Sequence, residues 1–275
     1  MKDNLYGLLG YKLTHSISPV IHEEILKRLN IDGRYELFEI EEYKLEDSIK
    51  RFKTSSIRGL NVTVPYKITA LKYIDELSEE VKNIGSINTI LFENGKTKGF
   101  NTDYYGFSLM LDKYDLNIKG KKALILGTGG AARAVVFSLL NKGIDKIYIA
   151  SRNAYKAKTG KWPPIAEILS YDYLKGLKNM DYIINCTPVG MFPNIDSSPA
   201  DREIIKNFSA AIDLIYNPYK TLFLKDAEEL GLKAFNGLYM LVAQAVISQE
   251  IWNNIAIDKN QIDIIFELIK EKIYL

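Results

Sequence analysis

The chain has 275 residues, of which 47% are hydrophobic and 25% are charged, as in an ordinary globular protein. This length exceeds one compact core of ordinary size and suits two domains. The 36 basic and 34 acidic side chains are spread along the whole chain, without a basic block or arm. A role in binding nucleic acid or a charged membrane surface therefore has little support.

Cysteine, histidine and the N-terminal residues argue against several further classes. Cys186 is the single cysteine and cannot form an internal disulfide, and two histidines are too few for a metal-ligand cluster. Residues 1–16 lack the uninterrupted apolar stretch of a signal peptide, and no apolar run is long enough to span a bilayer. We therefore expect a cytoplasmic enzyme that holds no metal and acts on a small molecule.

The first hundred residues carry strand and helix patterns in alternation. An apolar run predicts a short buried strand at 6–10. Ser18 and Pro19 predict the N-cap and first position of a helix that extends to about residue 29. The dipeptide Asn94-Gly95 predicts a hairpin between strands at 87–92 and 97–100. Further strands are expected at 34–40 and 59–64, and helices at 45–52 and 68–74.

A different pattern follows a helix expected at 103–113. A strand at 123–126, a glycine turn, a helix at 131–141 and a strand at 146–150 predict a parallel sheet with crossover helices. Pro163 and Pro164 would break a crossover helix, so we expect the strand–helix unit after Arg152 to be partly lost or irregular. Further apolar runs lie at 182–186 and 210–215, and two helices broken around 257–258 complete the chain.

The glycine turn has the spacing of a dinucleotide-binding fingerprint, G-x-G-x-x-G/A, between a strand and a helix. Gly127 permits the tight turn, Gly129 lets the backbone approach a pyrophosphate, and Ala132 lets helix and strand pack closely. N–H groups at the helix start favour phosphate charge. A purely structural glycine turn is the alternative, but the flanking strand and helix favour a bound dinucleotide.

The end of the next strand indicates which dinucleotide binds. An NAD site would place an Asp or Glu there for the ribose 2′-hydroxyl. The chain instead has Ser151-Arg152-Asn153, followed by Lys156. Two cations suit a 2′-phosphate, so we expect NADP(H); the alternative is that both are ordinary solvated charges.

Polar residues in the first hundred positions provide candidate chemistry. The hydroxyls of Ser16 and Ser18 project the same way from an extended turn and suit a carboxylate or neighbouring hydroxyls; Ser18 as a simple helix cap is the alternative. Reduction of a carbonyl needs a proton at oxygen as hydride reaches carbon, and Lys67 beside Asp103 is suited to supply it. A single lysine or aspartate would more often be a surface charge, so this hypothesis rests on their combination with the cofactor turn.

Several motifs together closely resemble those of the shikimate dehydrogenase family, in family order from residue 6 to about residue 250. They are NVTVPYK at 61–67, NTD at 101–103, SISP at 16–19, GSINT at 85–89, NCTPVGM at 185–191 and GLYMLVAQA at 237–245. The resemblance implies reduction of 3-dehydroshikimate to shikimate by NADPH, a step in aromatic amino-acid and chorismate biosynthesis. It also implies an α/β fold with a mostly parallel N-terminal substrate domain (1–102 plus about 241–275), a Rossmann-like NADP-binding domain (103–240) and a cleft between them.

The resemblance also assigns roles residue by residue. Lys67 and Asp103 match the catalytic pair, with Lys67 as the acid/base. The substrate-binding positions are Ser16, Ser18, Asn61, Thr63, Lys67, Asn88, Asp103, Tyr216 and Gln244. The cofactor positions are Gly127, Thr128, Gly129, Gly130, Ala131, Ser151, Arg152, Asn153, Lys156, Thr187, Leu214 and Gly237. Glu79 falls where some family members have a cofactor contact, but a surface helix residue explains it equally well.

One departure from the family concerns the cofactor loop, and three alternatives stay open. The family usually has Asn-Arg-Thr where this chain has Ser151-Arg152-Asn153, which narrows the margin of NADP over NAD. The alternatives are a quinate/shikimate dehydrogenase with dual substrate or NAD use, a non-catalytic NADP-binding sensor of the same fold, and a different two-domain reductase. A monomer and a homodimer are both compatible with the sequence.

Overall fold

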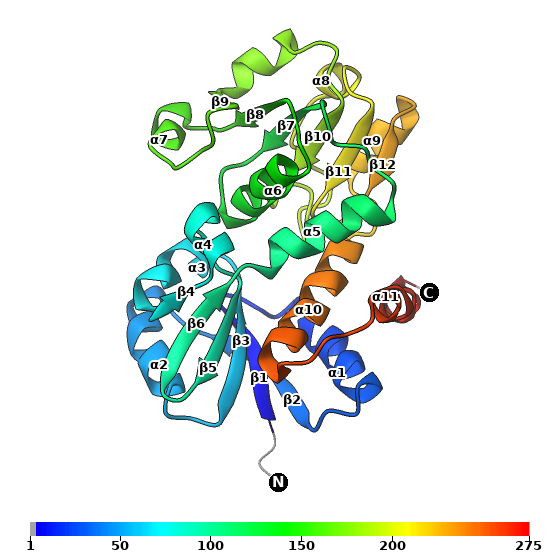
Figure 1. Cartoon of the computed structure of the whole chain (residues 1–275). Coiled ribbons are helices and arrows are strands. Elements are labelled where there is room, and N and C mark those ends of the chain that lie inside the picture. Colours follow the sequence, from blue (N-terminus) through cyan, green and yellow to red (C-terminus); the bar gives the residue numbers. More distant parts are fainter. Residues whose placement is uncertain (1–3, 275) are drawn as a thin grey trace. The chain divides into compact units, whose positions relative to one another are not determined.

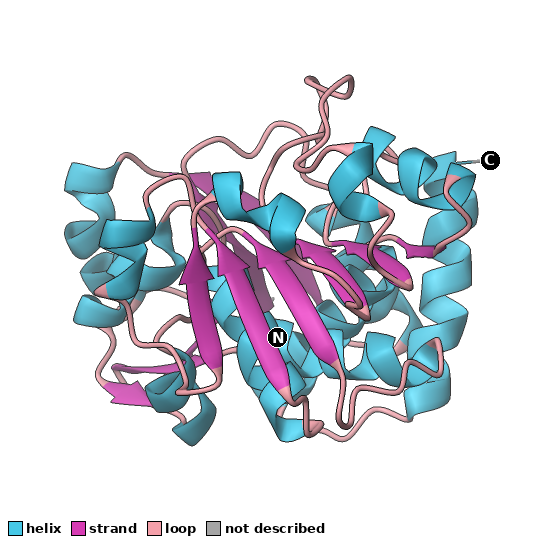
Figure 2. Ribbon diagram, turned by 90° about the horizontal axis from the view of Figure 1, so that it is seen from above, coloured by secondary structure: helices cyan, strands magenta, loops and turns pink. Residues whose placement is uncertain are grey.

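The computed structural model describes residues 4–274, and these form two compact units. The first unit comprises residues up to Gly106 together with residues from Leu241 onward, and the second is Phe107–Met240. Each unit has one six-stranded sheet (Figure 1). Figure 2 shows helices on either side of the strands. No helix in the described part of the chain is long and apolar enough to cross a membrane.

The sheet of the first unit has the order β2-β1-β3-β5-β6-β4. Its first three strands are parallel, whereas β5 is antiparallel to both of its neighbours. Asn94 and Gly95 both have positive φ, at 52° and 73°, as the predicted tight hairpin turn requires. The strands are β1 (Asn4–Gly10), β2 (Gly33–Glu39), β3 (Ile57–Val62), β4 (Glu76–Leu77), β5 (Thr89–Glu93) and β6 (Lys96–Phe100).

Helices cover this sheet, and two of them, α10 and α11, come from the C-terminal part of the chain. Trp252 of α10 is fully buried, and its indole N–H donates to the carbonyl of Ile90 at 3.0 Å. An added Cβ at Gly59 would lie 2.1 Å from the same indole nitrogen, so the strand approaches the ring as closely as a glycine allows. The helices that carry first-unit residues are α1 (Ser18–Arg28), α2 (Leu45–Phe52), α3 (Tyr66–Thr69), α4 (Glu79–Ile84), α5 (Thr102–Lys113), α10 (Leu238–Asn253) and α11 (Lys259–Tyr274).

The start of α1 corrects one expectation. Ser18 is the first residue of the helix and not its N-cap, which is Ile17 without a side-chain cap. The helix begins one residue earlier than expected, because the backbone N–H of Ile21 donates to the carbonyl of Ile17 at 3.1 Å. Ser16 closes the turn before the helix, since its hydroxyl accepts the backbone N–H of Ser18 at 3.2 Å.

The sheet of the second unit is entirely parallel, in the order β12-β11-β10-β7-β8-β9. Numbered within the unit this is 6-5-4-1-2-3, the doubly wound order that binds dinucleotides. The strands are β7 (Lys122–Leu126), β8 (Lys146–Ala150), β9 (Ala166–Leu169), β10 (Tyr182–Asn185), β11 (Ala210–Asp213) and β12 (Lys233–Phe235). The helices are α6 (Gly130–Asn141), α7 (Ala154–Lys158), α8 (Arg202–Ile205) and α9 (Leu222–Glu229), and the latter part of α5 also belongs to this unit.

The connection from β8 to β9 is irregular, as the two prolines predict, but its strand is not lost. The crossover helix α7 has only five residues and ends before Pro163 and Pro164. β9 nevertheless pairs with β8 over four residues and forms the edge of the sheet. An edge strand needs a partner on one side only, so it survives a shortened helix.

A buried carboxyl joins the carboxyl ends of β10 and β11. Asp213 is fully buried and accepts three hydrogen bonds: Asn185 Nδ2 at 2.9 Å, Thr221 Oγ1 at 2.7 Å and the N–H of Ile215 at 3.0 Å. Burial raises the pKa of the Asp213 carboxyl from 3.8 to about 7, against the lowering effect of these three bonds. The loops that follow the two strands are therefore held by one titratable group.

We predict that Gly59→Ala destabilises the protein by roughly 1–3 kcal/mol, because the new methyl group would force Trp252 and β3 apart. Urea denaturation measures the change in the free energy of unfolding. Gly176→Ala is the control, since nothing lies within 4 Å of a Cβ at that position. Equal stability of the two variants would contradict the close packing of Trp252 on the strand.

We also predict that Asp213→Asn changes the pH dependence of stability. The fold favours the protonated carboxyl, so the stability that Asp213 contributes falls as pH rises from 3.8 to about 7 and is constant above that. The free energy of unfolding of Asp213→Asn relative to the natural protein should therefore increase across this window. Denaturation curves at pH 4, 5.5 and 7.5 test this, and a relative stability that stays constant or decreases would contradict it.

Candidate active site

The two predicted catalytic side chains of the first unit contact each other. Lys67 lies on the short helix α3, which begins directly after Pro65, and Asp103 lies in the first turn of α5. Lys67 Nζ donates to Asp103 Oδ2 at 2.5 Å, and the side chains are only 17% and 8% exposed. The N-terminal end of a helix stabilises a carboxylate, so α5 supports the charge of Asp103.

Asn88 holds the other oxygen of Asp103. Its Oδ1 accepts the backbone N–H of Thr102 at 2.7 Å, and a backbone N–H can only donate, which fixes the orientation of the amide. Asn88 Nδ2 therefore faces Asp103 Oδ1, at 2.9 Å. The carboxylate is thus held at one oxygen by a cation and at the other by an amide.

Gln244 reaches the same cluster from α10. Its Oε1 accepts from Asn88 Nδ2 and from the hydroxyl of Thr102, both at 3.3 Å, while its Nε2 donates to the carbonyl of Leu241. Residues 88, 102 and 244 are far apart in sequence, so the site depends on the packing of α10 onto the first sheet.

Sequence reasoning gave no role to three hydroxyl residues behind this cluster: Thr89 and Thr102, which lie in the GSINT and NTD motifs, and Ser248, which lies outside the motifs. Ser248 Oγ lies 3.1 Å from Thr89 Oγ1 and 3.2 Å from Thr102 Oγ1, and Thr89 in turn donates to Asn88 Oδ1. The available signal was spacing, because Ser248 lies four residues after Gln244 and so on the same face of the helix.

Asn61 contacts these hydroxyl residues, and both of its polar side-chain atoms are hydrogen-bonded to protein groups. Its Nδ2 donates to Ser248 Oγ at 2.9 Å and to Thr89 Oγ1 at 3.1 Å, and its Oδ1 accepts from the hydroxyl of Tyr35 at 2.9 Å. Asn61 is 5% exposed. The geometry therefore supports Asn61 as a residue that positions its neighbours.

Ser16, Ser18 and Thr63 lie in the segments that follow two neighbouring strands, β1 and β3. β1 and β3 are paired in parallel, with Leu9 opposite Val62, so the loops after them begin side by side. Thr63 donates its N–H to the carbonyl of Leu9, and the hydroxyls of Ser16 and Ser18 are 3.1 Å apart. Loops at the carboxyl ends of parallel strands are the usual place for a ligand.

In the second unit the glycine turn has the geometry that a dinucleotide needs. Gly127 has a φ of +107°, which favours glycine, and an added Cβ would lie 3.0 Å from Thr187 Cγ2. Gly129 has an ordinary negative φ and nothing within 4 Å of an added Cβ, so the protein itself does not require a glycine there. A ligand that approaches the backbone closely would require a glycine at this position. The turn continues through Thr128 into α6, which begins with Gly130 and Ala131.

The loop after β8 presents two cations. The hydroxyl of Ser151 accepts the N–H of Asn153, and Asn153 Oδ1 caps α7 by accepting the N–H of Lys156 at 2.9 Å. Within residues 4–274, neither Arg152 nor Lys156 forms an ion pair with a carboxylate. A ligand with negative charge would supply the missing partner.

The remaining predicted cofactor residues lie on loops after β10, β11 and β12. The N–H and the hydroxyl of Thr187 both donate to Asn185 Oδ1, and Asn185 is bound in turn by Asp213. An added Cβ at Gly237 would lie 2.1 Å from the carbonyl oxygen of Leu214, so these two loops touch through their backbones.

Two other predicted positions stand apart. Tyr216 belongs to the second unit, on the loop that carries Leu214, whereas the other substrate positions belong to the first. Glu79 begins α4 and pairs with Lys82 on the surface of that helix, which favours the surface role over a cofactor contact.

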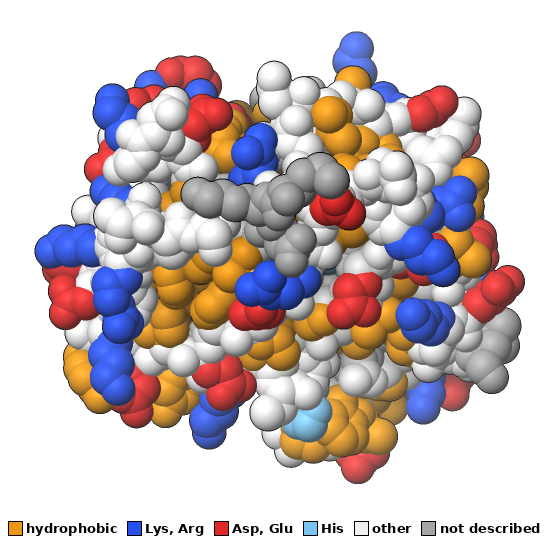
Figure 3. Space-filling model, turned by 90° about the horizontal axis from the view of Figure 1, so that it is seen from below, with side chains coloured by type: hydrophobic (Ala, Val, Ile, Leu, Met, Phe, Trp, Pro, Cys, Tyr) orange, Lys and Arg blue, Asp and Glu red, His pale blue; other side chains and the backbone are white. Residues whose placement is uncertain are grey.

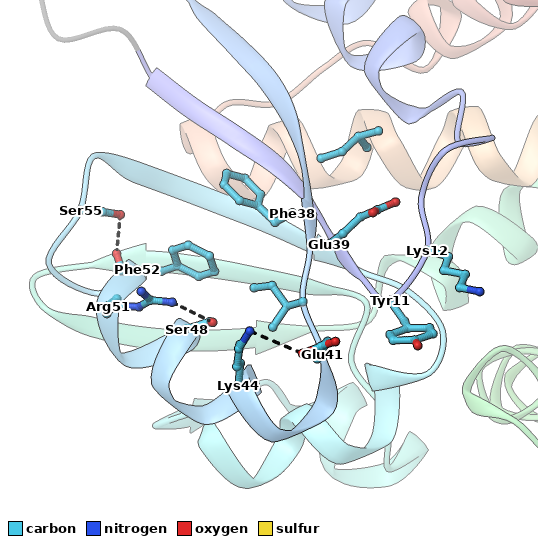
Figure 4. Close-up of a pocket in the computed structure, with 12 residues that line it drawn as sticks. Tyr11, Lys12, Phe38, Glu39, Glu41, Lys44, Ser48, Arg51, Phe52 and Ser55 are labelled. Atoms are coloured by element: carbon cyan, nitrogen blue, oxygen red, sulfur yellow. Dashed lines mark hydrogen bonds and ion pairs between the residues drawn. The ribbon is translucent and has the colours of Figure 1, made fainter.

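A pocket of about 920 Å³ in the first unit contains none of the predicted site residues. It lies between β2, the residues after β1 and α2, and two pairs of its polar side chains contact each other, Lys44 with Glu41 and Arg51 with Ser48 (Figure 4). The face drawn in Figure 3 carries acidic and basic side chains next to one another, with apolar ones between them. No group of three histidine, cysteine or acidic residues in the described chain is placed to hold a metal ion.

Comparison with known proteins agrees with this arrangement. A family model described as "Shikimate dehydrogenase substrate binding domain" matches residues 8–90, and one described as "Shikimate / quinate 5-dehydrogenase" matches residues 108–190. A protein of Clostridium beijerinckii named shikimate dehydrogenase (NADP(+)) is 44% identical over 92% of this chain and 93% of its own length.

Solved structures give the same result. The crystal structure of a chorismate mutase/shikimate 5-dehydrogenase fusion protein from Clostridium acetobutylicum is 48% identical, with a TM-score of 0.94 over 100% of both chains. The shikimate 5-dehydrogenase of Thermus thermophilus, in complex with NADP(H) and shikimate, is 31% identical, with a TM-score of 0.84 over 96% of this chain and 98% of that one. Family models that match more than half of the sequence, and relatives this similar over nearly its full length, show that the chain belongs to the shikimate dehydrogenase family.

Proposed function

We propose that this protein catalyses the reversible, NADP-dependent reduction of 3-dehydroshikimate to shikimate, a step in the biosynthesis of chorismate and aromatic amino acids. The first unit, with α10, would bind the substrate, and the second unit the cofactor. The observation that carries the proposal is the contact of Lys67 with Asp103 inside a hydrogen-bonded cluster of low exposure. A proton donor held this way suits a carbonyl oxygen that gains negative charge.

Lys67 would handle the proton of the reaction. Bound NADPH would supply a hydride for the carbonyl carbon, and Lys67 Nζ would give a proton to the carbonyl oxygen. Asp103 keeps Lys67 oriented and balances its charge, and Asn88 keeps Asp103 in place. The side chain of Lys67 is 17% exposed, so it can recover its proton from solvent after turnover. In the oxidation of shikimate the same groups act in reverse.

The substrate would be held by hydroxyl and amide groups around this pair. Ser16, on the connection between β1 and α1, and Ser18, the first residue of α1, suit the carboxylate, and Thr63 directly follows the adjoining strand β3. Gln244 and Asn88, which contacts Asp103 directly, are suited to the ring hydroxyls, with Tyr216 as a further contact. Asn61 contacts neither Lys67 nor Asp103 and would position the hydroxyl groups of Thr89 and Ser248.

The cofactor residues fit NADP better than NAD. The turn from Gly127 to Ala131 would receive the pyrophosphate at the start of α6. Arg152 and Lys156, with Ser151 and Asn153 shaping their loop, would bind the 2′-phosphate. Thr187, Leu214 and Gly237 would then line the nicotinamide side, because Asp213 holds the loops after β10 and β11 and Gly237 packs against Leu214.

We predict that Lys67→Met lowers kcat for shikimate oxidation by about 10²–10⁴-fold, because acid–base catalysis at the substrate oxygen is lost. Steady-state absorbance of NADPH measures the rate, and NADP+ binding should stay within twofold of the natural protein. Lys53→Met is the matched control, since Lys53 also pairs with a carboxylate, Asp75 at 2.7 Å, outside the site. Near-normal turnover of Lys67→Met would refute the role of Lys67.

The same assay separates the proposal from its alternatives when shikimate and quinate are each combined with NADP+ and NAD+. The proposal expects turnover of shikimate with NADP+ to exceed the other three combinations. Comparable turnover of quinate or use of NAD+ would indicate the broader quinate/shikimate activity. A folded protein that binds NADP+ but turns over neither substrate would indicate a sensor.

We predict that replacing both Arg152 and Lys156 by alanine raises the KM for NADP+ by about tenfold or more and leaves that for NAD+ nearly unchanged. The reason is the loss of charge-assisted contacts that only the 2′-phosphate makes. Arg202→Ala is the control, because that cation is held by Asp226 and Glu229 on the surface of the same unit. An equal rise for both nucleotides would contradict a 2′-phosphate site at these residues.

A further inference from the structure

Arg133 is a cation at an electrostatically unfavourable position. It is the fourth residue of α6, and its backbone N–H makes a hydrogen bond to the carbonyl of Gly129 at the helix start. The N-terminal end of a helix carries partial positive charge, which disfavours a cation there. The first turn of α6 contains no acidic residue that would offset this cost.

The guanidinium of Arg133 also lacks a protein partner for its charge. In the described part of the chain no carboxylate pairs with it, and its Nε is buried without a hydrogen-bond acceptor. Burial lowers the pKa of the Arg133 guanidinium, as expected for a charge with reduced access to water. Buried polar atoms are nearly always bonded, so an orphaned one calls for an explanation.

The guanidinium of Arg133 lies over the indole ring of Trp162. Arg133 Cζ lies 5.5 Å from the centre of the ring, within reach of a cation–π interaction. Trp162 Nε1 donates to the carbonyl of Ala157 at 2.9 Å, near the end of α7. The indole therefore joins α7, which follows the expected 2′-phosphate loop, to the first turn of α6, which faces the expected pyrophosphate.

This part of the second unit has a marked excess of positive charge. Residues 151–161 contain four cations, Arg152, Lys156, Lys158 and Lys161, and no acidic residue. None of the four forms an ion pair with a carboxylate of residues 4–274. Arg133 adds a fifth cation beside them, so the free protein leaves a cluster of charges that an anionic ligand would balance.

We propose that Arg133 is a further phosphate-binding residue of the cofactor site, kept on the face of Trp162 until NADP(H) binds. The inference rests on the proposed cofactor and goes beyond it, because it adds a residue from α6 to the cations of the β8 loop. The phosphate is either the pyrophosphate or the 2′-phosphate of the cofactor. Both are anions that an arginine binds through planar, paired N–H groups.

Calorimetric titration with NADP+ and NAD+ tests this on the natural protein, Arg133→Met and a control, Lys142→Met. Methionine preserves the aliphatic contact but removes the charge, and Lys142 lies at the other end of α6, paired with Asp112. Arg133→Met should weaken NADP+ binding by about ten- to a hundredfold, the range for hydrogen bonds to a charged group, and Lys142→Met by less than twofold. Weakening of both nucleotides assigns the pyrophosphate, and weakening of NADP+ alone assigns the 2′-phosphate.

Two further measurements separate binding from packing. Arg133→Lys should recover part of the lost affinity for NADP+, because it restores a cation. Trp162 should change its fluorescence when NADP+ saturates the natural protein, and this change should be absent in Trp162→Phe and reduced in Arg133→Met. Natural affinity in folded Arg133→Met, or equal losses in the Lys and Met variants, would overturn the proposal. If the natural protein binds neither nucleotide, the cofactor assignment itself is wrong, whatever the behaviour of Arg133.

Discussion

Asn88 Oδ1 accepts the backbone N–H of Thr102, and this bond determines which end of the amide faces Asp103. If the amide were reversed, its oxygen would lie against the carboxylate oxygen and repel it. The correct orientation depends on where α5 begins, because Thr102 and Asp103 are its first two residues. Lys67 lies on another helix and donates to the carboxylate of Asp103, whose orientation Asn88 fixes. The position of one helix start thus sets the geometry of the whole cluster.

In the second unit a buried carboxyl, and not an amide, orients the neighbouring site residues. Asp213 binds the end of β10 and the loop after β11, and through Asn185 it also orients Thr187. In each unit most of the residues expected to touch a ligand follow the ends of strands, and a buried polar side chain orients them. Such a network is costly when only partly satisfied, so its members constrain one another closely.

The parts of the molecule that depend on local chemistry were predictable from the sequence. The Asn94-Gly95 turn, the glycine turn at 127–130 and the effect of Pro163 and Pro164 on α7 are examples. The survival of β9 was not predictable, because it depends on pairing with β8. The role of Ser248 depends on the packing of α10 onto the first sheet, which the sequence does not show. Arg133 was not singled out, because the lack of an acceptor for its Nε is visible only in the structure. The Ser18 cap was wrong because the helix begins one residue earlier, with the N–H of Ile21 already bonded to the carbonyl of Ile17.

The return of α10 to the first unit has a consequence for how the chain is made. The ribosome completes β3, with Gly59, long before it adds Trp252, the side chain against which that glycine packs. The second unit, by contrast, is one unbroken stretch of chain that ends at Met240, before most of α10 and all of α11 are made. During synthesis the second unit can therefore reach its final form while the first still exposes an unfinished apolar surface. The last part of the chain closes that surface and, with Gln244 and Ser248, completes the catalytic cluster in the same event.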